Sequence, residues 1–202
     1  MESEMAAEST RKLTPADLFS LEAYSEQRPA FRQKVIAHKK RRTVHVGAHL
    51  TLLFEDRLLV QYQVQEMLRI ERIFEKPAVQ EELDAYNPLI PDGGNLKATC
   101  LIEYEDEGER REALAKLRGL EDQIWLEAGD GARVFAIADE DLDRANEDKT
   151  SAVHFLRFEL DAPAREALKR GLRLRIGSDH PEYREVAEVP KEIAAALAAD
   201  LA

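Results

Sequence analysis

The sequence predicts an α+β fold in which a helical N-terminal half packs on a mostly antiparallel C-terminal sheet. Residues 58–74 contain no Gly, Pro, Ser, Asn or Asp, and their apolar side chains recur with helical periodicity, which predicts a central buried helix. Residues 43–54 alternate apolar and polar side chains, which predicts one long amphipathic strand. Beyond residue 95, tight turns or short helices join the predicted strands, and this favours antiparallel pairing.

Two helices are expected in front of the strand. Thr14 is a good N-cap and Pro15 suits the first helical position, so the first, short helix begins there. The second is predicted from about Pro29 to His38. The cations of residues 39–42 suit its C-terminal end, where positive charge is favoured by the helix dipole.

The rest of the chain is expected to alternate between strands and short helices. Pro77 begins a helix, and the loop at 87–95 interrupts the chain. Strands are predicted at 96–104, 124–127, 132–137, 151–160 and 172–176, and helices at 107–118, at 161–170 and from 190 onward.

The length and composition indicate one cytoplasmic domain. Residues 1–12 are predicted to be a disordered tail and residues 13–202 a single domain, with 87–95 as the one plausible internal boundary. The acidic N-terminus has no apolar core of a secretion signal, and no apolar run reaches the roughly 18 residues of a membrane span. One cysteine excludes an internal disulfide.

The charge is distributed unevenly. The net charge of −11 argues against a general nucleic-acid binder. Residues 28–42, however, contain seven Lys or Arg and no acid. This run predicts either a solvated helix face and turn or a docking patch, for an acidic partner or for the acidic half of the chain itself. The candidate docking residues are Arg32, Lys39, Lys40, Arg41 and Arg42.

Glu66 is the most unusual residue of the predicted central helix. It falls inside the apolar arc, whereas the solvated edge is predicted to consist of Gln61, Gln65, Arg69, Arg72 and Glu75. A buried carboxylate needs a partner or a raised pKa. Glu66 therefore pairs with an arginine, such as Arg69 or one from residues 28–42, or acts as a metal ligand or general base. The third alternative is that it is exposed at an oligomer interface.

Histidines offer the other candidate site. His154 is predicted to face the core of its strand and His180 to lie in a turn, and with Glu66 they are weak candidates for a metal or catalytic site. Structural roles are the alternative for each. His45 and His49 share a strand face, but about 13 Å of straight strand would separate them. The ligands of one zinc lie about 4 Å apart.

Two further motifs are expected to be structural. Residues 139–143 mimic the start of a calcium loop, but the glycine and glutamate that such a loop needs are replaced by Arg144 and Thr150. Cys100 is predicted to be a buried, inert thiol. No metal or cofactor is expected.

Several segments together resemble one family. They are RRTVHVGAHLTLLFEDR (41–57), YQVQEMLR (62–69), AYNPLIPDG (85–93), LKATCLIEY (96–104), SAVHFLRFEL (151–160) and DHPEY (179–183). They resemble the uncharacterised bacterial family DUF3501 over nearly the whole chain. The resemblance implies no catalytic residues. Because members are often encoded beside a rubrerythrin-like protein and an iron–sulfur oxidoreductase, it implies a role in redox or peroxide-stress chemistry.

The leading hypothesis is a non-catalytic accessory protein that binds a rubrerythrin-like or iron–sulfur partner. One cysteine cannot ligate an iron–sulfur cluster, and the paired Glu-x-x-His motifs of a di-iron bundle are missing from the sequence. The first alternative is a small enzyme or metal-binding protein that uses Glu66 with His154 or His180. The second is a module that binds an anionic small ligand at Arg69 or Arg157.

Overall fold

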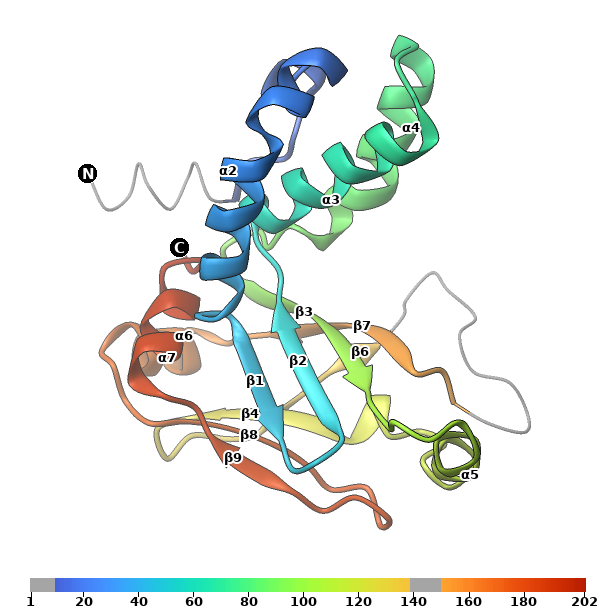
Figure 1. The fold of residues 1–202 in the computed structure, drawn as a ribbon. Coiled ribbons are helices and arrows are strands. Elements are labelled where there is room, and N and C mark those ends of the chain that lie inside the picture. The colour runs from blue at the N-terminus through green and yellow to red at the C-terminus, as the bar shows by residue number, and fades with distance from the viewer. Residues whose placement is uncertain (1–9, 139–149) are drawn as a thin grey trace.

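The computed structural model describes residues 10–138 and 150–202 and has a helical part on top of two antiparallel sheets (Figure 1). The described residues form six α-helices, three short 3₁₀ helices and nine strands. The predicted α+β class, with helices in the N-terminal half and antiparallel strands in the C-terminal half, is confirmed.

The helical part consists of α2 (Leu21–Lys39), α3 (Arg57–Glu71) and α4 (Lys76–Tyr86), with the 3₁₀ helices η1 (Pro15–Asp17) and η2 (Asn87–Leu89). It has a core of its own, which is formed by Leu13, Val60, Val64, Leu68, Leu83 and Ile90. Figure 1 shows these helices projecting from one side of the sheets.

The prediction of a helix that begins at Pro29 is wrong. α2 begins at Leu21, where the Ser20 hydroxyl caps the backbone N–H of Ala23, and Pro29 lies inside the helix. A proline removes one helical hydrogen bond, but burial of Tyr24 and Val35 on either side of it keeps the helix continuous.

The predicted single strand at 43–54 is also wrong, because these residues form a hairpin. β1 (Thr43–Val46) and β2 (Leu50–Phe54) pair antiparallel, and Val44 lies opposite Leu52. Gly47 turns the chain with φ +67°, a conformation that favours glycine. The alternation continues across the turn because both strands place the same apolar face against the core, so hydropathy alone did not reveal the turn.

The two sheets share one apolar core. The larger sheet has the order β1-β2-β3-β7-β6 and the smaller β5-β4-β8-β9. The remaining strands are β3 (Asn95–Ile102), β4 (Ile124–Ala128), β5 (Val134–Phe135), β6 (Ile137–Ala138), β7 (Val153–Glu159), β8 (Leu174–Ser178) and β9 (Val186–Glu188). The core contains side chains of both sheets, such as Leu52 and Phe158 from one and Leu126 and Ile176 from the other. The chain passes between the sheets at Ala136, after the predicted hairpin of β4 and β5.

Three helices cover the sheets: α5 (Glu107–Lys116), α6 (Ala162–Lys169) and α7 (Lys191–Ala198). Asp106 and Asp161 cap α5 and α6 through their carboxylates. After α7 the chain ends beside the loop that follows η2, where the backbone N–H of Ala202 donates to Gly93 O at 2.9 Å. The last residues therefore lie near the boundary between the helical part and the sheets.

The central helix α3 is less buried than its apolar arc predicted. Ile70, in the last turn of α3, is 61% exposed, and Phe74, beyond the end of the helix, is 76% exposed. Gln65, which was expected on the solvated edge, is fully buried. Gln65 Oε1 accepts from the backbone N–H of Phe19 at 2.6 Å. α3 packs between α2 and α4. The apolar core that these helices share is small and leaves some apolar residues of α3 exposed to solvent.

No α-helix in the described ranges is both long and apolar enough to cross a membrane.

Arg42 connects the helical part to the sheets. It follows α2, its residue exposure is 2%, and its Nε donates to Phe54 O at 2.8 Å. Its Nη2 donates to Glu55 O at 3.1 Å and forms an ion pair with Asp200. A second carboxylate contact joins Nη1 to Asp56 at 3.4 Å. Arg42 is therefore too buried to belong to a docking patch, and the prediction that it does is wrong.

We expect Arg42→Ala to reduce the free energy of unfolding by about 3 kcal/mol or more, because it leaves two buried carboxylates without their cation. The adjacent, exposed Arg41 is the matched control. Arg41→Ala should change the free energy of unfolding by less than about 0.5 kcal/mol. Urea unfolding of both variants measures the difference. Equal midpoints would show that Arg42 does not hold the two parts together.

Candidate functional site

Glu66 is the centre of a polar clamp between α2 and α3. Arg28 donates from Nε and Nη2 to the two carboxylate oxygens at 2.8 and 2.9 Å. The Tyr24 hydroxyl donates at 2.7 Å, and Arg69 Nη2 donates at 3.1 Å. Of the alternatives for Glu66, pairing with arginines is the arrangement that the structure has.

The surroundings of Glu66 favour its ionised form. The hydrogen bonds from Arg28 lower its pKa to about 2, with further lowering by Arg69 and Tyr24, although burial acts in the opposite direction. Burial and the adjacent carboxylate raise the pKa of Tyr24. A general base at Glu66 would need the opposite shift. The geometry instead suits fixing the position of one helix on another.

Aromatic rings extend this clamp. Phe31 on α2 lies 6.1 Å from the ring of Tyr24 and 5.9 Å from that of Tyr62 on α3, measured between ring centroids. Phe19 packs against both Tyr24 and Phe31. Such ring pairs add to the stabilisation from buried area.

Both arginines that were candidates for anion binding have carboxylate partners. Arg69 pairs with Glu66, and Arg157 pairs with Glu159. Each of the two side chains therefore already contacts a carboxylate, and Arg69 shares that of Glu66 with Arg28.

Neither His154 nor His180 has a hydrogen bond to Glu66 or to one of the partners of Glu66 given above. His154 on β7 is buried, and its Nε2 lies 2.8 Å from Thr150 Oγ1 and 3.8 Å from Glu121 Oε2. His180 Nε2 donates to Arg118 O at 3.1 Å, while its Nδ1 accepts from a backbone N–H. That pattern assigns His180 the neutral tautomer with the proton on Nε2. Each histidine thus has a local structural role.

Within residues 10–138 and 150–202, no group of three or more His, Cys, Asp or Glu is arranged to hold a metal ion. His45 and His49 lie on either side of the Gly47 turn: His45 Nδ1 is 2.9 Å from Thr51 Oγ1, and His49 stacks on Tyr104. Cys100 is buried on the core side of β3. The calcium-like segment at 139–149 lies outside the described residues.

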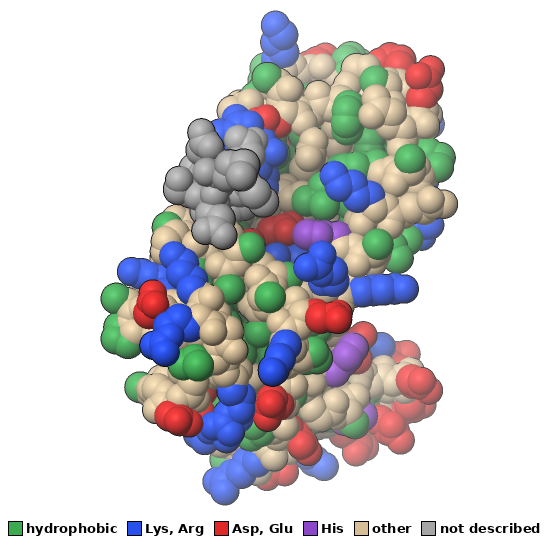
Figure 2. All heavy atoms as spheres, turned by 90° about the vertical axis from the view of Figure 1, so that its left-hand side faces the viewer, with side chains coloured by type: hydrophobic (Ala, Val, Ile, Leu, Met, Phe, Trp, Pro, Cys, Tyr) green, Lys and Arg blue, Asp and Glu red, His purple; other side chains and the backbone are tan. Residues whose placement is uncertain are grey.

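The remaining exposed cations of the 28–42 run form a basic surface on α2 and the turn that follows it, which we define as Arg32, Lys34, Lys40 and Arg41. All four are exposed, and no ion pair joins them to a carboxylate in the described part of the chain. Ile36 lies among them and is 44% exposed. Figure 2 turns the α2 side of Figure 1 toward the viewer and shows Lys and Arg side chains spread over this face. Lys39 is half-buried and lies near Glu55, so it contributes less than predicted.

A cluster of charged side chains at the boundary of the two parts escaped the sequence-based prediction. We define the Arg42 cluster as Arg42, His38, Asp56 and Asp200. His38 Nε2 lies 2.5 Å from Asp56 Oδ2, and the other Asp56 oxygen caps the backbone N–H of Leu59 at 2.9 Å. Asp200 lies 158 positions beyond Arg42, so no local pattern could have connected them.

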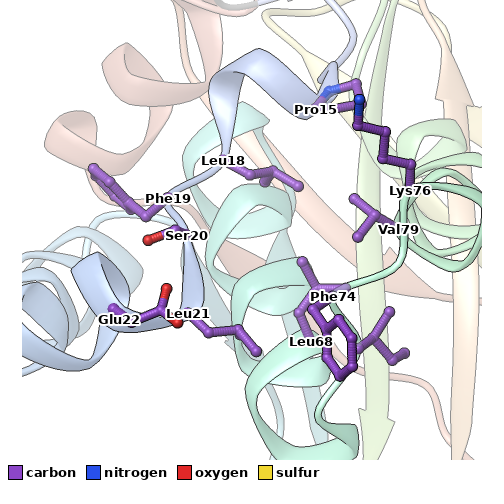
Figure 3. Close-up of a pocket in the computed structure, with 11 residues that line it drawn as sticks. Pro15, Leu18, Phe19, Ser20, Leu21, Glu22, Leu68, Phe74, Lys76 and Val79 are labelled. Carbon is purple, nitrogen blue, oxygen red and sulfur yellow. The ribbon is translucent and has the colours of Figure 1, made fainter.

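An apolar groove of about 350 Å³ lies between the start of α2, the end of α3 and the start of α4. Figure 3 shows Leu18, Leu68 and Phe74 along it, with Glu22 and Lys76 at its rim. The exposed side chain of Phe74 forms part of its wall. The sequence-based prediction placed this aromatic residue in the core and so missed the groove.

We expect Glu66→Gln to lower the free energy of unfolding by about 1–2 kcal/mol at pH 7, after allowance for solvent screening of the half-exposed arginines. Because the folded-state pKa lies below the unfolded value of 4.5, this stabilisation is present above pH 4.5 and is lost as the pH falls through about 2. Urea unfolding at pH 7 and pH 3 measures the decrease.

Glu71→Gln, on the exposed side of α3, is the control and should change the free energy of unfolding by less than about 0.5 kcal/mol. A Glu66 effect that is the same at both pH values would argue against an ionic clamp.

Comparison with known proteins identifies the family. A crystal structure of a protein from Burkholderia pseudomallei K96243, described as a novel protein of unknown function, is 54% identical. The match covers 95% of this chain and 100% of that chain, with a TM-score of 0.91. No curated protein matches. The family model described as "Protein of unknown function (DUF3501)" matches residues 12–201, and the chain therefore belongs to the DUF3501 family.

Proposed function

We propose that this chain is a non-catalytic interaction protein that binds an acidic surface of a redox partner through the basic surface of α2. The observation that carries the proposal is the exposure of Arg32, Lys40 and Arg41 without a neighbouring carboxylate partner, in a chain whose net charge is −11. A chain with 40 acidic residues could have neutralised these cations locally.

The distribution of the arginines supports a selective role for the basic surface. Arg28 and Arg42 come from the same run and are neutralised internally by Glu66 and by Asp56 with Asp200. The exposed cations remain available to an acidic protein surface, and their field accelerates and orients association. Ile36 supplies an apolar contact among them, as protein interfaces commonly do.

The resemblance to the family supports a rubrerythrin-like protein or an iron–sulfur oxidoreductase as the partner. The single cysteine of this chain cannot hold an iron–sulfur cluster, so that redox group would belong to the partner. The role of this chain would be to position or regulate that partner in the cytoplasm.

We expect purified wild-type protein to bind a purified rubrerythrin-like protein or iron–sulfur oxidoreductase of the same organism at low ionic strength. Raising the salt from about 20 to about 200 mM should weaken binding, because exposed charges are then screened. The double variant Arg32→Glu/Lys40→Glu should lose about tenfold or more in affinity, measured by biolayer interferometry.

Arg184→Glu/Lys191→Glu is the matched control, since it makes the same change in net charge at two exposed cations outside α2. It should bind within about twofold of the wild type. An equal loss in both double variants would indicate only general charge attraction. If the wild-type chain bound neither protein at low salt, the redox-partner proposal would be wrong.

A further inference from the structure

The Arg42 cluster brings together three segments that are distant in the sequence. Arg42 follows α2, Asp56 lies between β2 and α3, and Asp200 follows α7. Asp200 is only 4% exposed, and its carboxylate pairs with Arg42 Nη2. Arg42 Nη1 also lies 3.4 Å from Ala196 O. The same guanidinium therefore holds the C-terminal end of α7 against the helical part.

The charges in this cluster do not balance when both carboxylates are ionised. One buried guanidinium faces Asp56 and Asp200, and His38 adds a positive charge only when it is protonated. With His38 neutral, the cluster has one cation and two anions, and Arg42, Asp56 and Asp200 are all buried. A buried net charge is costly, so binding one proton stabilises this arrangement.

The pKa values of the two carboxylates shift in opposite directions. Burial raises the pKa of Asp200 to about 6, with the charge of Asp56 adding to the rise and Arg42 opposing it. Burial also acts on Asp56, but its hydrogen bond with His38 and the charge of Arg42 lower its pKa overall. The proton therefore resides preferentially on Asp200. The other charged groups that face the two carboxylates are His38 at the end of α2, Arg42 in the turn after it and Glu55 after β2. Lys39 acts on the carboxylate of Glu55.

We propose that the Arg42 cluster is a proton-sensitive latch, which holds the C-terminal segment 191–202 on the helical part at mildly acidic pH and loosens it above neutral pH. The segment has few other polar attachments at this boundary among the described residues. The backbone bond from Ala202 to Gly93 is one of them. Opening at Asp200 exposes its carboxylate to water without disturbing the hairpin of β1 and β2.

The direction of the pH dependence follows from the folded-state pKa of Asp200, which lies above the ordinary value of 3.8. The stabilisation is fully present below 3.8 and is lost as the pH rises through about 6. The latch is therefore closed more firmly at pH 5 than at pH 8. Between pH 5 and the folded-state pKa of about 6, the opening equilibrium changes about tenfold per pH unit, and above that pKa it no longer changes. The opening equilibrium should therefore differ by about tenfold between pH 5 and pH 8.

Hydrogen–deuterium exchange of the purified chain tests the latch. After correction for intrinsic exchange rates, the backbone amides of residues 191–202 should be protected about tenfold less at pH 8 than at pH 5. Amides of α5, which is distant from Arg42 in the hydrogen-bond network, should show no such change. Asp200→Asn should remove the difference, and Asp84→Asn, at an exposed position on α4, should retain it.

Three results would overturn the proposal. Equal protection of residues 191–202 at both pH values in the wild type would do so without any variant. A pH difference that persists in Asp200→Asn would assign the proton to another group, with His38 the nearest. An equal loss of protection in α5 would indicate a pH effect on the whole fold and not a latch.

Discussion

The interaction on which the architecture depends is the burial of Arg42 among two carboxylates and three backbone carbonyls. The helical part and the sheets have separate apolar cores, so apolar packing alone does not specify how the two parts are joined. A guanidinium has donors in a fixed planar arrangement, and it accepts only a narrow range of partner positions. Arg42 therefore sets the orientation of α2 against β2 and α7, although a buried ion pair contributes less net stability than its close contacts suggest.

A second arginine from the same run has a similar role within the helical part. Arg28 binds Glu66 through both carboxylate oxygens and orients α2 along α3. The two arginines lie on the inward side of α2 and its C-terminal end, whereas Arg32 and Lys40 face solvent. One basic run thus serves two purposes: internal neutralisation of buried acids, and a positively charged surface on an acidic protein.

The apolar groove beside Phe74 adds to the apolar surface that the helical part exposes to solvent. Ile70 and Phe74 leave apolar area in contact with water at the end of α3, where a third layer of structure would cover it in a larger bundle. A groove of about 350 Å³ with apolar walls is near the lower end of sizes typical for small ligand sites. The sheets, in contrast, bury their apolar faces against each other and under α5, α6 and α7.

The sequence by itself determined the α+β class, most element positions and the need of Glu66 for a partner, because periodicity, caps and a charge in an apolar arc are local properties. It could not distinguish a hairpin from a strand at Gly47, since alternation is the same on both sides of the turn. Only the tertiary structure decided that Gln65 is buried and Phe74 exposed, because those depend on which residues the neighbouring segments cover on α3 and just beyond its end. It alone brought Asp200 to Arg42. The attraction between two charges depends on their distance in space, and 158 positions of intervening chain carry no information about that distance.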